Sequence, residues 1–167
     1  MKRIFVDEER CLGCRSCEIA CAIKHSHSNK LEKAIREQPL PISRIRVRKD
    51  ENNAIPLQCR HCPEPSCVYA CIAGGIRKDE KTGLVVFEEK KCVRCYSCVM
   101  VCPFAVIKLG KEEQPAVKCD LCQEEEIPPC VRACPTGALF FGEAEEFQEL
   151  MEKRRKRGEK DALLNTG

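Results

Sequence analysis

The residues that could carry chemistry in this chain are its sixteen cysteines, which fall into four quartets with none left over. The quartets are Cys11, Cys14, Cys17 and Cys21; Cys59, Cys62, Cys67 and Cys71; Cys92, Cys95, Cys98 and Cys102; and Cys119, Cys122, Cys130 and Cys134. The first and third follow the spacing C-x2-C-x2-C-x3-C, in which thiolates converge on iron–sulfur clusters. The other two keep the leading C-x2-C and the trailing C-x3-C. At four thiolates per cluster, the sequence predicts four [4Fe–4S] clusters, an arrangement suited to a wire.

Two other uses of cysteine compete with this interpretation. A disulfide framework is typical of small secreted domains, but the chain begins Met1-Lys2-Arg3 and lacks the apolar run of a signal peptide. Paired C-x2-C units also make tetrahedral zinc sites. Zinc sites seldom need third and fourth cysteines at these spacings, however, and a proline (Pro103, Pro135) follows the last cysteine in two quartets, as in iron–sulfur proteins. The pattern favours iron–sulfur clusters.

The formal charge of +3 counts no clusters. An oxidised cluster with its four thiolates carries about −2, so four clusters would bring the charge to about −5. Compensation for the cluster charge therefore explains the basic residues better than nucleic-acid binding does. We expect no nucleic-acid binding. Arg15, Arg60, Arg94 and Lys118 lie within or beside the cysteine loops, where a cation would favour a reduced cluster; the alternative is an ordinary solvated surface charge.

The sequence also predicts where the protein works. No stretch approaches the roughly 20 apolar residues of a membrane span, so we expect no direct membrane insertion. Unpaired thiols and oxygen-sensitive clusters fit a reducing, anaerobic interior, and we expect a soluble, cytoplasmic protein. True hydrophobes are scarce once the cysteines are set aside, so metal binding should supply much of the folding free energy, and the apoprotein should be largely unfolded.

Internal repetition predicts the fold. Short apolar segments precede or follow the quartets, and each trailing C-x3-C places two cysteines one helical turn apart. The strand candidates are Arg3–Val6, Leu84–Phe87, Val106–Leu109, Ala116–Lys118 and Leu139–Phe141. The repeating unit is thus strand, cysteine loop, short helix and strand. Two such units make a ferredoxin fold, so the sequence predicts an α+β protein with a double bacterial-type ferredoxin fold around four [4Fe–4S] clusters.

We expect a four-cluster domain over residues 1–142. Its inner module covers about 55–110, its outer module 1–24 plus 111–142, and an insertion about 25–54. Within the insertion, Ser28–Glu37 could form a helix and residues 45–48 alternate like a strand. His25, His27 and His61 are expected to be surface or hydrogen-bonding residues; cluster ligation by a histidine is the alternative.

Residues 143–167 form a predicted helical tail. Acidic residues come first and five basic residues, 153–157, follow, ending at a glycine stop, Gly158. Phe147, Leu150 and Met151 give the helix one apolar face. We expect a packed terminal helix with a solvated basic end; docking onto a partner is the alternative.

The four-quartet pattern resembles the electron-transfer subunits of the dimethyl sulfoxide reductase, formate dehydrogenase-N and hydrogenase families, over residues 1 to about 142. The resemblance implies crossed ligation, in which the fourth cysteine of one quartet binds the cluster of its partner quartet. The implied ligand sets are Cys11, Cys14, Cys17 and Cys134; Cys119, Cys122, Cys130 and Cys21; Cys59, Cys62, Cys67 and Cys102; and Cys92, Cys95, Cys98 and Cys71. Some relatives hold a three-iron cluster where a cysteine of the third quartet is replaced, but this chain keeps Cys98.

Within that family, residues 11–26 are most similar to the CooF-type iron–sulfur proteins of carbon monoxide dehydrogenase, and residues 58–62 and 99–104 agree. This implies an electron carrier between carbon monoxide dehydrogenase as donor and a hydrogenase or a flavin NAD(P) oxidoreductase as acceptor. We expect no catalysis, because cysteine would ligate every iron fully and no glycine-rich phosphate loop is present. The alternatives are an iron–sulfur subunit of a formate dehydrogenase, hydrogenase or molybdopterin oxidoreductase and, more remotely, a zinc-binding interaction module.

Overall fold

The computed structural model describes residues 1–51, 53–110 and 114–164. Residues 52, 111–113 and 165–167, which belong to the predicted insertion, outer module and tail, lie outside the described residues. The strands are β1 (Arg3–Val6), β2 (Arg46–Lys49), β3 (Ala54–Leu57), β4 (Ile76–Lys78), β5 (Val85–Phe87) and β6 (Leu139–Gly142). The helices are α1 (Ser16–Lys24), α2 (Leu31–Ala34), α3 (Ser66–Tyr69), α4 (Ser97–Met100), α5 (Pro129–Arg132) and α6 (Ala144–Leu164), with 3-10 turns at Glu8–Arg10 and Glu89–Lys91.

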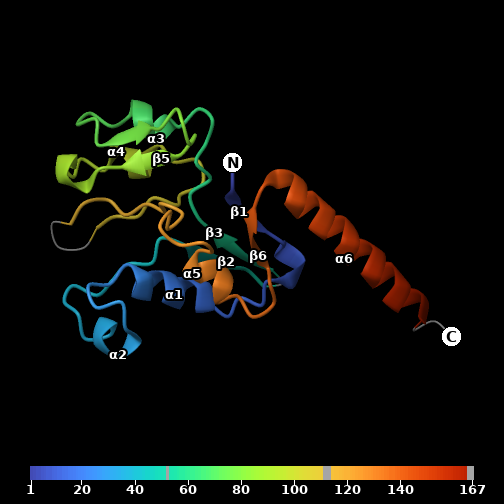
Figure 1. Ribbon diagram of the computed structural model, residues 1–167. Helices are drawn as coiled ribbons and strands as arrows, with labels where there is room; N and C mark the ends of the chain where they lie inside the picture. The colour runs from blue at the N-terminus through green and yellow to red at the C-terminus, as the bar shows by residue number, and fades with distance from the viewer. Residues whose placement is uncertain (52, 111–113, 165–167) are drawn as a thin grey trace.

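The strands pair into three antiparallel two-stranded sheets. Strand β1 pairs with β6, so that Ile4 lies opposite Phe141 and the two ends of the cysteine-containing region meet. Strand β4 pairs with β5, and β2 pairs with β3 to form a hairpin between the first two quartets. In Figure 1 the part with α3, α4 and β5 lies above the part with α1, α5, β1 and β6.

Each of these two parts has its own hydrophobic cluster, and cysteines contribute to both. The first cluster combines residues such as Ile4, Val47 and Leu139 with buried cysteines of the first and fourth quartets. The second is built on Ile76, Val85 and Cys98, with cysteines of the second and third quartets packed against it. Cysteine thiols take places that larger apolar side chains usually fill in a core. We therefore expect the packing of both parts to depend on any group that the cysteines bind.

The β1, β5 and β6 predictions are confirmed to within one residue at each end. The residue 45–48 segment also forms a strand, β2, shifted by one position. The strands predicted at Val106–Leu109 and Ala116–Lys118 are wrong: only one bridge, between Lys108 and Val117, joins them in the described part of the chain. The ladder cannot extend toward the loop because Pro115 has no N–H to donate.

The helix predicted at Ser28–Glu37 is also wrong in extent, since only the four residues of α2 are helical. The Glu37 carboxylate accepts hydrogen bonds from the backbone N–H groups of His27 (3.1 Å) and Ser28 (3.0 Å). It also accepts one from the Ser28 hydroxyl. These bonds close the segment into a compact loop instead of a longer helix.

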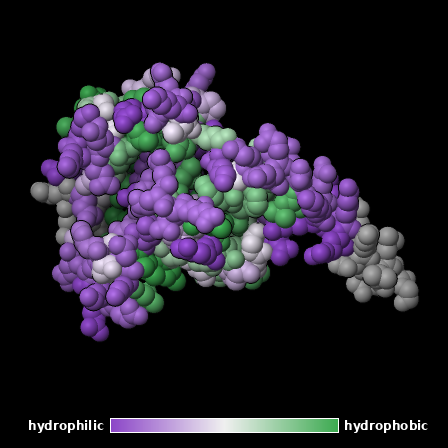
Figure 2. Space-filling model, viewed as in Figure 1, coloured by the Kyte–Doolittle hydropathy of each residue, from purple (hydrophilic) through white to green (hydrophobic). Residues whose placement is uncertain are grey.

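Helix α6 packs through its first turns and then leaves the body of the molecule (Figure 1). The Phe147 ring stacks on Phe5 with 5.0 Å between centroids and lies 5.8 Å from Phe140, which confirms a packed terminal helix. The predicted stop at Gly158 is wrong, because the helix runs on to Leu164. One glycine inside a helix costs only about 1 kcal/mol. The viewed face of the helix is mostly hydrophilic (Figure 2).

None of the helices that the structure describes is long and apolar enough to cross a membrane.

Candidate metal centres

The sixteen cysteines gather in space into four sets of four, and each set takes members from two quartets. We call them spatial sets A to D. Set A is Cys11, Cys14, Cys17 and Cys134; set B is Cys21, Cys119, Cys122 and Cys130; set C is Cys59, Cys62, Cys67 and Cys102; set D is Cys71, Cys92, Cys95 and Cys98.

Two of the sets line small cavities of their own. All four cysteines of set A line one cavity, closed by Val47 and Leu139 from the hairpin and from β6. All four cysteines of set C line another, between Val85, Pro103 and Phe104. The guanidinium of Arg60 lies 4.4 Å from the centre of the Phe104 ring, at the side of set C.

Sets B and D are identified by the effect of their cysteines on one another: the charge of each thiolate raises the pKa of a neighbouring thiol. Burial raises the pKa of the Cys130 thiol, and the charges of the other three cysteines of set B raise it further. Burial raises the pKa of Cys98 in the same way, followed by the charges of the other three cysteines of set D. Such mutual repulsion requires thiolates that face a common space.

Charges and contacts link set A to set B, set B to set C and set C to set D. The charge of Cys17 in set A contributes to the raised pKa of Cys130 in set B. The charge of Cys59 in set C contributes to the raised pKa of Cys119 in set B, about 12, for which burial is the main cause. Sets C and D meet in one hydrophobic cluster around Cys98. Cys14 in set A and Cys95 in set D are the exposed cysteines, so the two ends of the series reach the surface.

All four quartets share one backbone feature that positions their sulfur atoms. The second residue after each leading cysteine has a left-handed backbone: Gly13 (φ 66°), His61 (φ 47°), Arg94 (φ 60°) and Leu121 (φ 62°). A side chain in this conformation costs roughly 1–3 kcal/mol, and such outliers concentrate at binding sites. The left-handed conformation recurs at the same position of each quartet, with strain at three of the four and none at Gly13, which indicates four equivalent loops.

The left-handed turn directs backbone N–H groups at cysteine sulfur. The N–H of His61 donates to the Cys59 sulfur and the N–H of Arg94 to the Cys92 sulfur, both at 3.4 Å. Other segments do the same from outside the loops, as when the N–H of Arg44 donates to the Cys21 sulfur at 3.1 Å. Hydrogen bonds of this kind stabilise thiolates and raise the potential of the metal group they bind.

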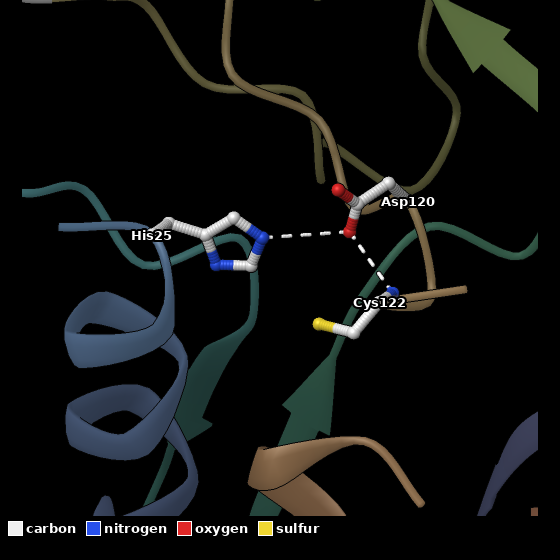
Figure 3. Close-up of side chains that lie close together, drawn as sticks. All are labelled: His25, Asp120 and Cys122. Carbon is white, nitrogen blue, oxygen red and sulfur yellow. Dashed lines mark hydrogen bonds and ion pairs between the residues drawn. The ribbon is translucent and has the colours of Figure 1, made fainter. Parts of the chain in front are cut away.

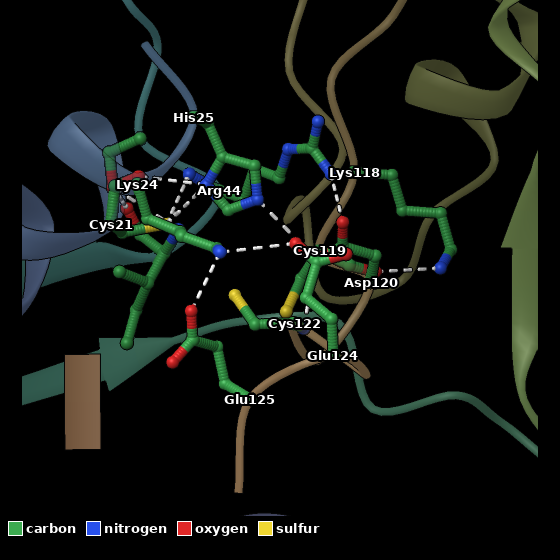
Figure 4. A network of polar contacts seen from close by, with 12 residues as sticks. Cys21, Lys24, His25, Arg44, Lys118, Cys119, Asp120, Cys122, Glu124 and Glu125 are labelled. Atoms are coloured by element: carbon green, nitrogen blue, oxygen red, sulfur yellow. Dashed lines mark hydrogen bonds and ion pairs between the residues drawn. The ribbon is translucent and has the colours of Figure 1, made fainter. Parts of the chain in front are cut away.

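A polar network surrounds set B and ties the insertion to the fourth quartet (Figure 4). Arg44 pairs with Asp120 at 2.5 Å, and Lys24 pairs with Glu125 at 2.7 Å. These contacts fix α1 and the insertion against the loop that carries Cys119 and Cys122. Arg44 and Asp120 were not identified from the sequence, where nothing sets them apart from solvated surface charges.

His25, Asp120 and Cys122 place their ligand atoms within 4.8 Å of one another (Figure 3). The Asp120 carboxylate is already occupied, since one oxygen faces His25 Nε2 at 3.4 Å and accepts from the Cys122 N–H at 3.1 Å, while the other pairs with Arg44. Burial would lower the pKa of His25, but hydrogen bonds to Asp120, Cys122 and Cys21 raise it to about 11. The group braces set B through the paired charges of Asp120, Arg44 and His25.

The rings of His25 and His61 have the hydrogen-bonding roles expected of them. His25 also contacts the backbone oxygen of Cys21 at 2.8 Å. His61 is 1% exposed, and its Nδ1 accepts a hydrogen bond from the Val85 N–H at 3.0 Å. Burial lowers the pKa of His61 to about 3, helped by the charge of Lys118, so the ring is neutral and not a surface residue.

The donor sets fit [4Fe–4S] clusters. Each set offers four sulfur atoms, and burial raises the pKa of thiols such as Cys17 and Cys119 to about 12, so that these thiols stay protonated until a cation replaces the proton. Lys118 lies between cysteine sets and is only 4% exposed, so it is a buried positive charge beside thiols that become negative when they ionise. Thiolate sets with a buried cation beside them suit a metal group that is negative overall.

Sequence comparisons assign the chain to a family. The model of the 4Fe-4S dicluster domain matches residues 51–144, and that of a 4Fe-4S binding domain matches residues 8–22. The putative electron transport protein YsaA of Escherichia coli is 37% identical over 148 residues, which is 87% of this chain and 92% of YsaA.

Two further relatives have the same character. An iron-sulfur protein of Rhodospirillum rubrum is 36% identical over 171 residues, covering 92% of this chain and 88% of that protein. The iron-sulfur subunit of the nitrate-inducible formate dehydrogenase of Escherichia coli is 31% identical over 168 residues, 90% of this chain and 57% of the subunit. The chain is therefore an iron–sulfur electron transport protein that belongs to the 4Fe-4S dicluster domain family.

Proposed function

We propose that spatial sets A to D each bind one [4Fe–4S] cluster, with ligation crossed between quartets. The outer module, residues 1–24 with 111–142, would hold sets A and B; the inner module, about 55–110, would hold C and D. The proposal is supported by the four cysteines gathered in each set and by the left-handed residue repeated in every quartet. A cluster ligated by four thiolates exchanges single electrons and offers no open iron for substrate.

The chain would act as an electron wire, and the neighbour relations that link set A to B, B to C and C to D support this function. Set A ends the series at the exposed Cys14, beside the exposed Leu12 and Ile19. Set D ends it at the exposed Cys95, on the part of the fold where Tyr69, Ile72 and Met100 are also exposed. Two exposed ends suit one redox partner each, and exposed apolar side chains beside them suit docking.

The donor we propose is carbon monoxide dehydrogenase, and the acceptor a hydrogenase or a flavin NAD(P) oxidoreductase. The support is the similarity of residues 11–26 to CooF-type proteins. That stretch contains most of set A and helix α1, together with His25, which braces set B. The donor would therefore dock at the set A end, and we place the protein in the cytoplasm of an anaerobic cell.

A second candidate is the iron–sulfur subunit of a formate dehydrogenase or related oxidoreductase. The relative with that name supports it, although this chain spans only about half of that subunit's length. The wiring would be the same and only the donor would differ.

The test is anaerobic reduction of the clusters by candidate donors. Reduced carbon monoxide dehydrogenase should bleach the visible absorbance of the protein and, with hydrogenase added, give CO-dependent hydrogen. Replacing Leu12 at the set A end with Glu should slow reduction by the donor, whereas replacing Met100 at the set D end with Glu should slow only transfer to the acceptor. Ready reduction by formate dehydrogenase, with none by carbon monoxide dehydrogenase, would favour the second candidate.

A further inference from the structure

Lys118 is a buried cation that joins the two parts of the fold. Its side chain is 4% exposed, and its ammonium donates hydrogen bonds to the backbone oxygen of Val85 in β5 and to that of Cys119 at 2.9 Å. Figure 4 shows the hydrogen bond from its ammonium to the backbone oxygen of Cys119. Among the residues that the structure describes, no carboxylate forms an ion pair with it.

A buried ammonium whose acceptors are only carbonyl oxygens is costly unless negative charge lies nearby. The nearest carboxylate along the chain, Asp120, is taken by Arg44 and His25. The cysteine sets beside Lys118 supply negative charge once their thiols ionise on binding a metal group.

Lys118 is held next to two of the cysteine sets. On the set C side, Lys118 donates to the backbone oxygen of Val85, and Val85 lines the cavity that the four cysteines of set C share. In set B, Lys118 holds the peptide oxygen of Cys119, the residue that follows it. Val85 links the two: its backbone oxygen accepts a hydrogen bond from Lys118, and its N–H donates to the ring of His61. His61 lies two residues after Cys59 of set C.

We propose that Lys118 is the redox-tuning cation of the junction between the two modules, which raises the reduction potentials of the clusters in sets B and C. A reduced cluster carries one more negative charge than an oxidised one, so a fixed positive charge between two clusters stabilises their reduced forms. Each transfer moves one electron, oxidising one cluster and reducing its neighbour. With Lys118 in place, the central pair of clusters attracts the electron across the junction between the modules.

This inference rests on the proposed four-cluster wiring but not on the identity of the donor. The chain offers a matched control: Lys91 precedes Cys92 as Lys118 precedes Cys119, but the Lys91 side chain is 54% exposed and pairs with Glu88 at 2.7 Å. Solvent and that carboxylate should screen the Lys91 charge. The three variants to compare are therefore Lys118→Gln, Lys118→Arg and Lys91→Gln.

The measurement is a mediated redox titration of anaerobically loaded protein, followed by electron paramagnetic resonance, with iron counted in every sample. In Lys118→Gln, two of the four one-electron components should move to lower potential by at least about tenfold in equilibrium constant, or about 59 mV. Lys118→Arg and Lys91→Gln should each change every component by less than about twofold in the same constant.

Fully loaded Lys118→Gln whose components do not move would overturn the proposal, as would Lys118→Arg that shifts them as far as Gln does. If Lys118→Gln cannot hold its clusters while Lys118→Arg can, the positive charge is required and the proposal stands. If neither variant loads, Lys118 is a structural residue only and the proposal fails. An iron count far below sixteen in the unsubstituted protein would instead contradict the proposed wiring.

Discussion

The Cys21 thiol near the end of helix α1 faces Cys130 of helix α5, although more than a hundred residues separate the two in sequence. Burial raises the pKa of the Cys130 thiol, and the charge of Cys21 raises it further, ahead of the other members of set B. Burial also raises the pKa of Cys17, one turn earlier in α1, but the cysteine charges that add to this are those of Cys134 and Cys11 of set A. One helix thus delivers its two buried cysteines to two different sets.

The first prediction uses this division. Cys21→Ser should damage the cluster of set B and spare that of set A, whereas Cys17→Ser, one turn earlier, should do the reverse. Each variant should retain about three quarters of the iron, because one of four clusters is affected. Redox-resolved paramagnetic spectra of the two variants should lose different components. Loss of the same component in both would mean that one quartet holds its own cluster.

The second prediction concerns removal of the clusters. Anaerobic chelation should abolish most protection against hydrogen exchange in both parts of the fold, because cysteines make up much of each hydrophobic cluster. Resupplying iron and sulfide under reducing conditions should restore it. Apoprotein that keeps native protection in β1 and β6 would show that the fold does not depend on metal.

The third prediction concerns the ion pair that holds α6. Arg154 pairs with Asp7 at 2.5 Å and also donates to the backbone oxygen of Gly137 at 3.1 Å. Asp7 is 4% exposed, so Arg154→Ala leaves a buried carboxylate without its partner and should destabilise the attachment of α6 by about 2 kcal/mol.

Hydrogen exchange within residues 144–157 is the measurement, and Arg155→Ala is the control, since Arg155 is exposed. Equal exchange in both variants would show that the ion pair does not anchor the helix.

The fourth prediction compares two glycines with left-handed backbone. A methyl group at Gly13 (φ 66°), in the first cysteine loop, would lie 3.1 Å from the Ala54 side chain, while one at Gly74 (φ 62°) would meet nothing within 4 Å. Gly74→Ala should therefore cost about 1–2 kcal/mol from backbone strain alone. Gly13→Ala should cost more and should lower the iron content at set A. Identical thermal stability and iron content in both would refute the idea that the hairpin closes set A.

The sequence predicted the parts of this molecule that repeat. Cysteine spacing predicted the quartets, and short apolar runs such as Arg3–Val6 predicted strands, because period and residue type are local properties. The failed strands at residues 106–109 and 116–118 have the same apolar character, but Pro115 limits their pairing to a single bridge. The position of Pro115, next to the predicted strand at residues 116–118, was the sequence feature from which the short pairing could have been predicted.

The environment of the cysteines depended on tertiary structure and was not predictable in the same way. Lys118 and Arg94 both lie beside cysteine loops in the sequence, and only the structure shows that Lys118 is buried. Arg44 reaches Asp120 across 76 positions of sequence, and no local pattern marks either residue. Pairings of this kind follow from how the insertion packs onto the fourth quartet.

The most direct test of the account is the iron and acid-labile sulfide content of protein purified and reconstituted without oxygen. Four fully ligated clusters predict about sixteen iron and sixteen sulfide per chain, with Mössbauer spectra of [4Fe–4S] centres alone. An iron content near eight in fully reconstituted protein, or stoichiometric zinc in place of iron, would contradict the four-cluster wire.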